Sequence, residues 1–208
     1  MSRFLIPRAD YQRIFRTIYS VLANETIELT KACVAINTIG ASILNKFYGL
    51  DARPFAGIAG YCVKPESVIL FATNDNGTLK ADDCGFHCWI EAEDWVVDFT
   101  TPLFPRLVQG SAIPDPGSKM MQRKYLSAKQ SPQELVSAGD YFIHADIDFT
   151  KHALKKFASK QGHHDLINIC VNWYQKPPRV MMDSIGIGNE KGEVREVKLS
   201  RFSVIGEW

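Results

Sequence analysis

Residues 31–48 constrain the fold of this chain more than any other segment. They predict a helix whose apolar side chains cover most of its circumference, namely Val34, Ile36, Ile39, Ile43, Leu44 and Phe47. A helix of that kind has to be buried on most of its sides. Gly49 follows it, and glycine commonly ends a helix. Residues 10–23 predict a second, amphipathic helix, so the chain opens with helices, one of which lies inside the core.

Strand patterns follow these helices. They fall at residues 54–63, 67–73, 85–91, 95–100, 140–147, 179–187 and 193–204. Two further helices are predicted at 150–161 and 163–175, and the polar segments 74–83 and 109–118 are predicted as loops. We therefore expect an α+β fold in which the buried helix packs on a mainly antiparallel sheet. Its 208 residues correspond to a single domain over residues 1–208.

The charge balance argues against a polyanion-binding surface. The chain has 24 Lys and Arg against 23 Asp and Glu, a net charge of +1. The cations of residues 119–129 are not accompanied by a ladder of aromatic residues, so we expect a solvated face there and no nucleic-acid partner.

The apolar runs and the cysteine count predict the compartment of the protein and the redox state of its thiols. No apolar run approaches the ~18 residues of a membrane span, nor the roughly 7 residues that a signal peptide needs near its start. We therefore expect a cytoplasmic protein with no membrane partner. The odd count of five cysteines favours reduced thiols over a disulfide framework.

Cys33 is the first candidate for chemistry. With Thr30 as the N-cap, it occupies the third position of the buried helix. The helix dipole at that end stabilises negative charge and so favours the nucleophilic thiolate. A small buried core residue is the alternative interpretation of a lone cysteine.

His87 and Asp98 form the second candidate. With a two-residue turn at Glu93-Asp94, Glu91 faces Val96 and Ile90 faces Val97, which puts His87 and Asp98 on one face as diagonal neighbours. A carboxylate there can accept a hydrogen bond from the imidazole and fix its tautomer. One more residue in the turn would move Asp98 to the other face.

Four short motifs occur in a fixed order along the chain: TKACVA at residues 30–35, GLDARPFAG at 49–57, HCWIE at 87–91 and WVVDFT at 95–100. Together they resemble the transglutaminase-like group of the papain-like cysteine enzymes, which includes the arylamine N-acetyltransferases. We expect the chain to belong to a small bacterial family of unassigned function that has this fold. The resemblance covers about residues 24–102, and the half from about residue 103 onward has no counterpart in it.

The resemblance implies a role for each of three residues. Cys33 is similar to the nucleophile that forms a thioester, His87 to the general base and acid, and Asp98 to the orienting carboxylate. It implies a cysteine-dependent hydrolase or acyl transferase without a cofactor, acting on an amide or thioester of a peptide, a protein or a small molecule. Ala32 and Val34 depart from the glycine or tryptophan that many relatives carry beside the cysteine.

Several alternatives stay open. Trp89 could line the acyl pocket or be a core aromatic residue. The Cys33 backbone N–H could donate to an oxyanion, whereas Asn24 and Asn37 both have the chemistry of the second donor. A zinc site at Cys84, His87 and Cys88 is the chemical rival, but adjacent strand residues face opposite ways, so no metal is expected.

A catalytically inactive relative that binds a peptide or a protein is the alternative function. All three residue types of the triad are present, which favours the enzyme. The oligomeric state is not predicted.

Overall fold

A computed structural model describes residues 3–25, 28–29 and 32–208. Its helices are α1 (Arg8–Leu22), α2 (Cys33–Tyr48), α3 (Phe104–Leu107), α4 (Ile147–Ala158) and α5 (His163–Trp173). The strands are β1 (Ala52–Lys64), β2 (Ser67–Phe71), β3 (Thr73–Asp75), β4 (Thr78–Lys80), β5 (His87–Ala92), β6 (Trp95–Asp98), β7 (Lys119–Lys124), β8 (Tyr141–Ala145), β9 (Ser184–Gly188), β10 (Val194–Lys198) and β11 (Gly206–Glu207).

One seven-stranded sheet organises the molecule. Its order is β11-β7-β6-β5-β1-β2, with β8 pairing additionally with β1. Of its strand pairs, β11 with β7 is parallel and the rest are antiparallel. The predicted α+β class with helices on an antiparallel-rich sheet is therefore confirmed. Strands β7, β8 and β11 come from the half of the chain that the motifs do not cover, so both halves build the same sheet.

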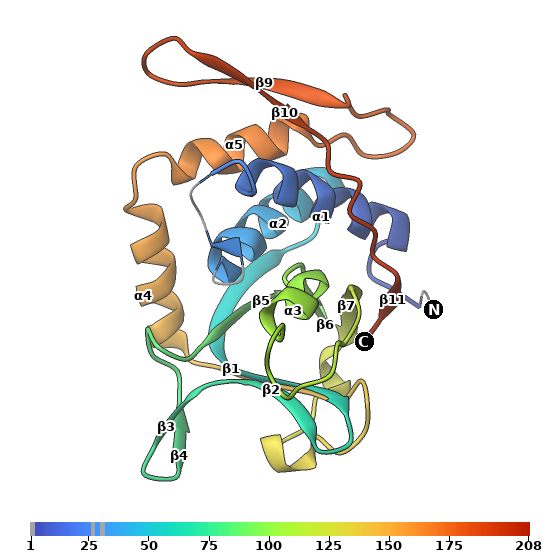
Figure 1. The fold of residues 1–208 in the computed structure, drawn as a ribbon, viewed down its shortest axis with the longest axis vertical. Helices are drawn as coiled ribbons and strands as arrows, with labels where there is room; N and C mark the ends of the chain where they lie inside the picture. Colours follow the sequence, from blue (N-terminus) through green and yellow to red (C-terminus); the bar gives the residue numbers. More distant parts are fainter. Residues whose placement is uncertain (1–2, 26–27, 30–31) are drawn as a thin grey trace.

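The core lies on both faces of the sheet. Helices α1, α2 and α5 stack together on one face (Figure 1), where α2 contributes Ile36, Ile39, Ile43 and Leu44, all fully buried. The second cluster is built around Tyr61, Trp89, Phe104, Met121 and Trp208. The expectation that α2 lies inside the core is thus confirmed. Across the described ranges, no helix has the length and apolar character needed to cross a membrane.

The β5–β6 hairpin has the predicted register. Ala92 pairs with Trp95, Glu91 with Val96 and Ile90 with Val97. Glu93 takes a positive φ of 55° in the two-residue turn, as tight hairpin turns require. The register brings the first residue of β5, His87, and the last residue of β6, Asp98, to the same end of the hairpin.

Several local predictions are corrected by the structure. Helix α2 begins at Cys33 with Ala32 as its N-cap, so Cys33 is the first helical residue and not the third. Thr30, the predicted cap, lies outside the described residues. The predicted loop 74–83 contains most of the β3–β4 hairpin. Residues 193–204 form the shorter strand β10, and the short strand β11 was not predicted.

Strand β7 corrects the first part of the solvated face expected at residues 119–129, whereas residues 125–127 are exposed. Met120 packs into the helix-covered core and Met121 into the opposite cluster, and neither side chain is exposed. The strand lies between β6 and β11. Its cations Lys119, Arg123 and Lys124 are half-buried at its ends, because the two methionines occupy the positions that face the core.

Gly57 generates a testable prediction for the fold. It pairs with His87 on one side and Ala145 on the other, and an added Cβ would lie 2.1 Å from the carbonyl oxygen of His144. We expect Gly57→Ala to destabilise the protein by about 1–3 kcal/mol, because backbone cannot move aside cheaply. Chemical denaturation measures this loss. Gly188→Ala is the matched control, since its nearest neighbour is 4.0 Å away; equal stability of the two variants would contradict the close packing at Gly57.

Candidate active site

Cys33 lies at the start of α2 and is buried, with 7% of its surface exposed. Its side chain belongs to a small cluster with Ala56, Cys88 and Ala153. Because Cys33 is the first helical residue, its backbone N–H is among those without a partner inside the helix. The position combines a thiol with the positive end of a helix dipole.

His87 connects Cys33 to Asp98. Its Nε2 lies 2.7 Å from Oδ2 of Asp98, and its side chain forms a further hydrogen bond with that of Cys33. Since Nε2 is engaged with Asp98, Nδ1 is the ring nitrogen left for the thiol. The imidazole stacks on Phe71 with the ring centroids 4.3 Å apart and an interplanar angle of 24°. These contacts hold the ring in one orientation.

Asp98 is a fully buried carboxylate whose partners are all donors. Oδ2 accepts hydrogen bonds from His87 and from the hydroxyl of Tyr61, at 2.9 Å. Oδ1 accepts from the backbone N–H of Thr100 at 2.7 Å and from its hydroxyl at 2.6 Å. Nδ2 of Asn37 lies 3.1 Å from the same oxygen. These donors satisfy a carboxylate that has no contact with water.

Asn37 is a positioning residue that ties the helix to the hairpin. Its Nδ2 lies within 3.2 Å of the backbone oxygens of Cys33 and Cys88, and within 2.9 Å of Oγ1 of Thr100. Its Oδ1 accepts from the backbone N–H of Phe99 at 3.0 Å. Because these groups engage both ends of the amide, Asn37 is not free to serve as an oxyanion donor. Asn24, the other candidate, donates to the carbonyl of Ser20.

The buried groups favour a charged imidazole beside a charged carboxylate. Burial alone would lower the pKa of His87, but the charge and hydrogen bond of Asp98, aided by Cys33, raise it to about 10. Burial opposes ionisation of Asp98, yet His87 and the Thr100 hydrogen bonds hold its pKa below the usual range. Burial, with Asp98 next, raises the pKa of Tyr61 well above its ordinary value, so this hydroxyl stays a neutral donor.

The other cysteines differ from Cys33 in their surroundings. Burial, followed by the nearby Cys33 and Asp98, raises the pKa of the Cys88 thiol well above its usual value. Burial likewise raises the pKa of Cys62 and Cys170, both of which lie in the core. Cys84 is exposed. Cys33 differs from these four cysteines in its hydrogen bond to the His87 imidazole.

The structure brings together all three residues predicted for the triad, but it corrects the expectation for Trp89. Its ring is fully buried in the core cluster on the sheet face that lies away from α1, α2 and α5. Its Nε1 donates to Glu91 at 3.0 Å. Because its ring has no exposed surface and packs in the core cluster with Tyr61 and Met121, Trp89 is a core aromatic residue. Asn37, Tyr61 and Thr100 were not predicted as partners of Asp98, although Asn37 was a candidate oxyanion donor and Thr100 lies in the WVVDFT motif.

The residues considered for zinc do not form a cluster. Within residues 3–25, 28–29 and 32–208, no three His, Cys, Asp or Glu side chains lie close enough together to hold a metal ion. His87 is bonded to Asp98, whereas Cys88 packs on Ala56 and Ala153 on the other side of the strand.

Fold and site together define an α+β protein in which a cysteine, a histidine and an aspartate from α2, β5 and β6 form one buried hydrogen-bonded cluster. The chain belongs to the family described as "Protein of unknown function (DUF2026)", whose model matches residues 7–208. A solved structure, "The crystal structure of genomics APC5867", is similar with a TM-score of 0.89 and 30% identity. That match covers 100% of this chain and 99% of the other. No curated protein matches the chain.

The raised pKa of His87 predicts how stability depends on pH. The folded value of about 10 exceeds the ordinary 6.5, so the stabilisation by the charged imidazole is complete below about pH 6.5 and is lost as the pH rises through about 10. We therefore expect the difference in free energy of unfolding between the wild type and His87→Gln to shrink across this window. Urea denaturation at several pH values measures it. Titrating groups remote from His87 contribute equally to both proteins and cancel, so a constant difference would contradict a protonated His87.

Proposed function

We propose that this protein is a cysteine-dependent acyl-transfer enzyme, either a hydrolase or a transferase, with Cys33 as nucleophile, His87 as general base and acid, and Asp98 as the orienting carboxylate. The observation that carries the proposal is the hydrogen-bonded chain from Cys33 through His87 to Asp98. A nucleophile, a base within reach of it and a third group that orients the base are the structural signature of this chemistry. The resemblance of residues 24–102 to transglutaminase-like enzymes of the papain-like fold supports the same assignment.

The first half of the reaction forms a thioester. The Cys33 thiolate attacks the carbonyl carbon of an amide or thioester, and the carbonyl oxygen becomes an oxyanion that accepts from the Cys33 backbone N–H at the start of α2. Collapse of this intermediate breaks the bond to the leaving amine or thiol, which takes its proton from the His87 imidazolium. The acyl group is then held on Cys33, and His87 is neutral.

The second half releases the acyl group. A water molecule or an acceptor amine gives its proton to His87 as it attacks the thioester carbon, and the Cys33 thiolate departs. Asp98 stays ionised throughout and stabilises the imidazolium. Water as acceptor makes the protein a hydrolase, and an amine makes it a transferase.

Acyl-enzyme formation tests the proposal directly. With p-nitrophenyl acetate as a small activated ester, we expect a burst of p-nitrophenolate and an acetyl group on Cys33, identified by peptide mass spectrometry. Cys33→Ala should abolish the burst, because the nucleophile is lost. Cys84→Ala is the matched control, since Cys84 is exposed and lies outside the cluster. Acetylation of Cys84 in preference to Cys33 would contradict the assignment.

The Asp98→Asn variant distinguishes the proposed enzyme from the alternative, a catalytically inactive relative that binds a peptide or a protein. The change removes the negative charge and turns an acceptor for His87 into a donor, so the imidazole takes the other tautomer and cannot accept a proton from Cys33. The same exchange in serine triads lowers turnover by about 10⁴-fold. A preformed thiolate–imidazolium pair depends less on its third member, and we expect Cys33 alkylation by iodoacetamide near pH 7 to slow by about 10–100-fold.

The readout is the pH profile of Cys33 alkylation, with alkylation of the exposed Cys84 as an internal reference. In the wild type, Cys33 should react before Cys84 despite its burial. In Asp98→Asn, the Cys33 profile should move to higher pH while that of Cys84 stays unchanged. Thermal melts report whether the variant folds. Superimposable Cys33 profiles in two equally stable proteins would favour the binding module.

A further inference from the structure

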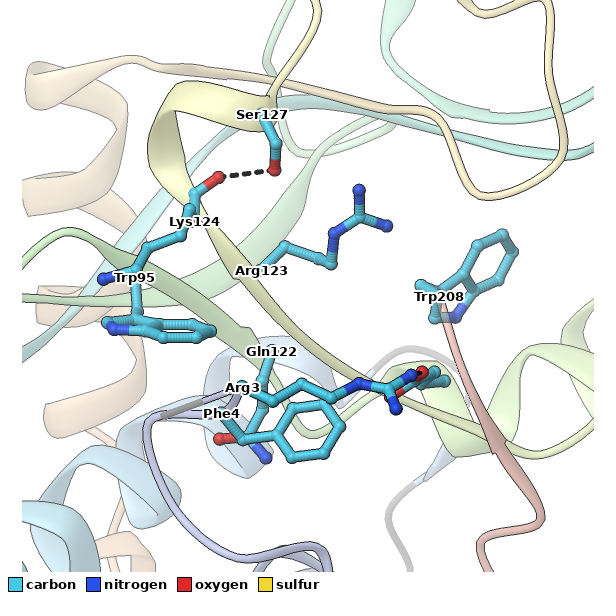
Figure 2. Close-up of a pocket in the computed structure, with 9 residues that line it drawn as sticks. Arg3, Phe4, Trp95, Gln122, Arg123, Lys124, Ser127 and Trp208 are labelled. Carbon is cyan, nitrogen blue, oxygen red and sulfur yellow. Dashed lines mark hydrogen bonds and ion pairs between the residues drawn. The ribbon is translucent and has the colours of Figure 1, made fainter. Parts of the chain in front are cut away.

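A second concave site lies away from Cys33, beside strand β7. The cavity measures about 370 Å³ and is bounded by β7, by Trp95 at the start of β6, and by the segments Arg3–Phe4 and Glu207–Trp208 (Figure 2). Arg3, near the N-terminus, and Glu207, in β11, pair with each other there. A volume of this size is typical of small-molecule sites.

The walls of this cavity combine aromatic rings with positive charge. Phe4, Trp95 and Trp208 supply the rings, and Arg3, Arg123 and Lys124 supply the cations. Glu207 pairs with Arg3. Lys124 pairs with Asp94 at 2.5 Å and places its Nζ 4.3 Å from the centre of the Trp95 ring. Two of the three cations are therefore neutralised by partners within the protein.

Arg123 is the cation whose charge remains uncompensated. Over the part of the chain that the structure describes, its guanidinium has no carboxylate partner. Its contacts are a long hydrogen bond of 3.4 Å to the carbonyl of Gly139 and the ring of Tyr141, 5.8 Å from its central carbon. In Figure 2 the Arg123 side chain leaves β7 on the side where Trp208 lies. Its remaining N–H groups are available to an anion.

Trp208 provides an independent sign of a missing partner. The residue is 6% exposed, and its indole N–H is buried without an acceptor among the described residues. Buried polar groups are rarely left unsatisfied in proteins, and each such group calls for an explanation. Because this N–H has almost no accessible surface, a ligand in the cavity completes the hydrogen bonding of Trp208 only if the indole ring turns toward it.

We propose that this cavity binds a small planar organic carboxylate. The carboxylate oxygens accept from the Arg123 guanidinium, whose planar fork matches that geometry, and from the indole N–H of Trp208. The flat apolar body of the ligand packs against the aromatic rings of Phe4 and Trp95. Inorganic phosphate would leave these rings without a contact, and an organic cation would be repelled by the unpaired Arg123. The site is separate from Cys33 and does not depend on the function proposed above.

Benzoate is the probe, because it combines one carboxylate with one flat ring. We expect saturable binding by isothermal titration calorimetry with a Kd of about 1 mM, as suits a ligand of its size. The indole N–H resonance of Trp208, followed by NMR, should shift in step with saturation. Benzamide has the same shape without the charge, and acetate has the charge without the ring; both should bind at least about tenfold more weakly.

Three variants locate the site. Arg123→Gln removes the charge and should weaken benzoate binding by about 10–100-fold. Trp208→Phe retains a ring but loses the N–H, and should weaken binding about 2–10-fold. Arg201→Gln removes an exposed arginine that does not line the cavity, and should leave binding unchanged. If Arg123→Gln fails to fold in thermal melts, Arg123→Lys retains the charge without the fork and should weaken binding by a smaller factor.

Certain outcomes would overturn the proposal. Titrations without saturation by benzoate, or equal binding of benzoate and benzamide, would rule out a carboxylate site. Unchanged binding in folded Arg123→Gln or Arg123→Lys would place any bound benzoate elsewhere. Tighter binding of inorganic phosphate than of benzoate would show that the aromatic rings do not contribute to ligand recognition.

Discussion

The fully buried carboxylate of Asp98 is the interaction on which the rest of the site depends. An isolated carboxylate in an apolar core is very unfavourable, and it persists only where hydrogen bonds replace its hydration. Here the donors come from different parts of the fold: Asn37 from α2, Tyr61 from β1, His87 from β5 and Thr100 from the turn after β6. The hydroxyl of Tyr11 in α1 donates to the Asp98 backbone carbonyl at 2.5 Å. Satisfying one charge therefore brings these segments together.

This arrangement has a direct consequence for His87 and Cys33. The charge and hydrogen bond of Asp98, together with Cys33, outweigh the desolvation of the imidazole and raise its pKa, so the protonated ring is favoured and oriented at the start of α2. Preorganisation of that kind costs no rearrangement at the moment of reaction, which is the property that an acyl-transfer site needs. The same hydrogen bonds give the cluster a structural role, because removing any donor leaves part of a buried charge unsatisfied. Stability and the proposed chemistry are thus coupled at this point.

The features that the sequence predicts well are local. The apolar circumference of α2 predicts its burial, and the two-residue turn at Glu93-Asp94 predicts the pairing of Glu91 with Val96. Both follow from periodicities of 3.6 and 2 residues that neighbouring residues alone determine. That register placed His87 beside Asp98, and the resemblance to transglutaminase-like enzymes added Cys33 to them. The prediction failed for β7, because its cations suggested a solvated face, whereas its burial depends on strands β6 and β11 and on helices far away in the chain.

The sequence by itself determined the fold class, the buried helix, the hairpin register and three residue types suited to acyl transfer. Tertiary structure decided which groups stabilise Asp98, since Asn37 and Tyr61 lie 61 and 37 positions from it in the chain. It also decided that Trp89 faces the core and that Arg123 and Trp208 line one cavity. The physical reason is the same in each case: hydrogen-bond satisfaction and close packing depend on neighbours in space, and local sequence patterns carry no record of them.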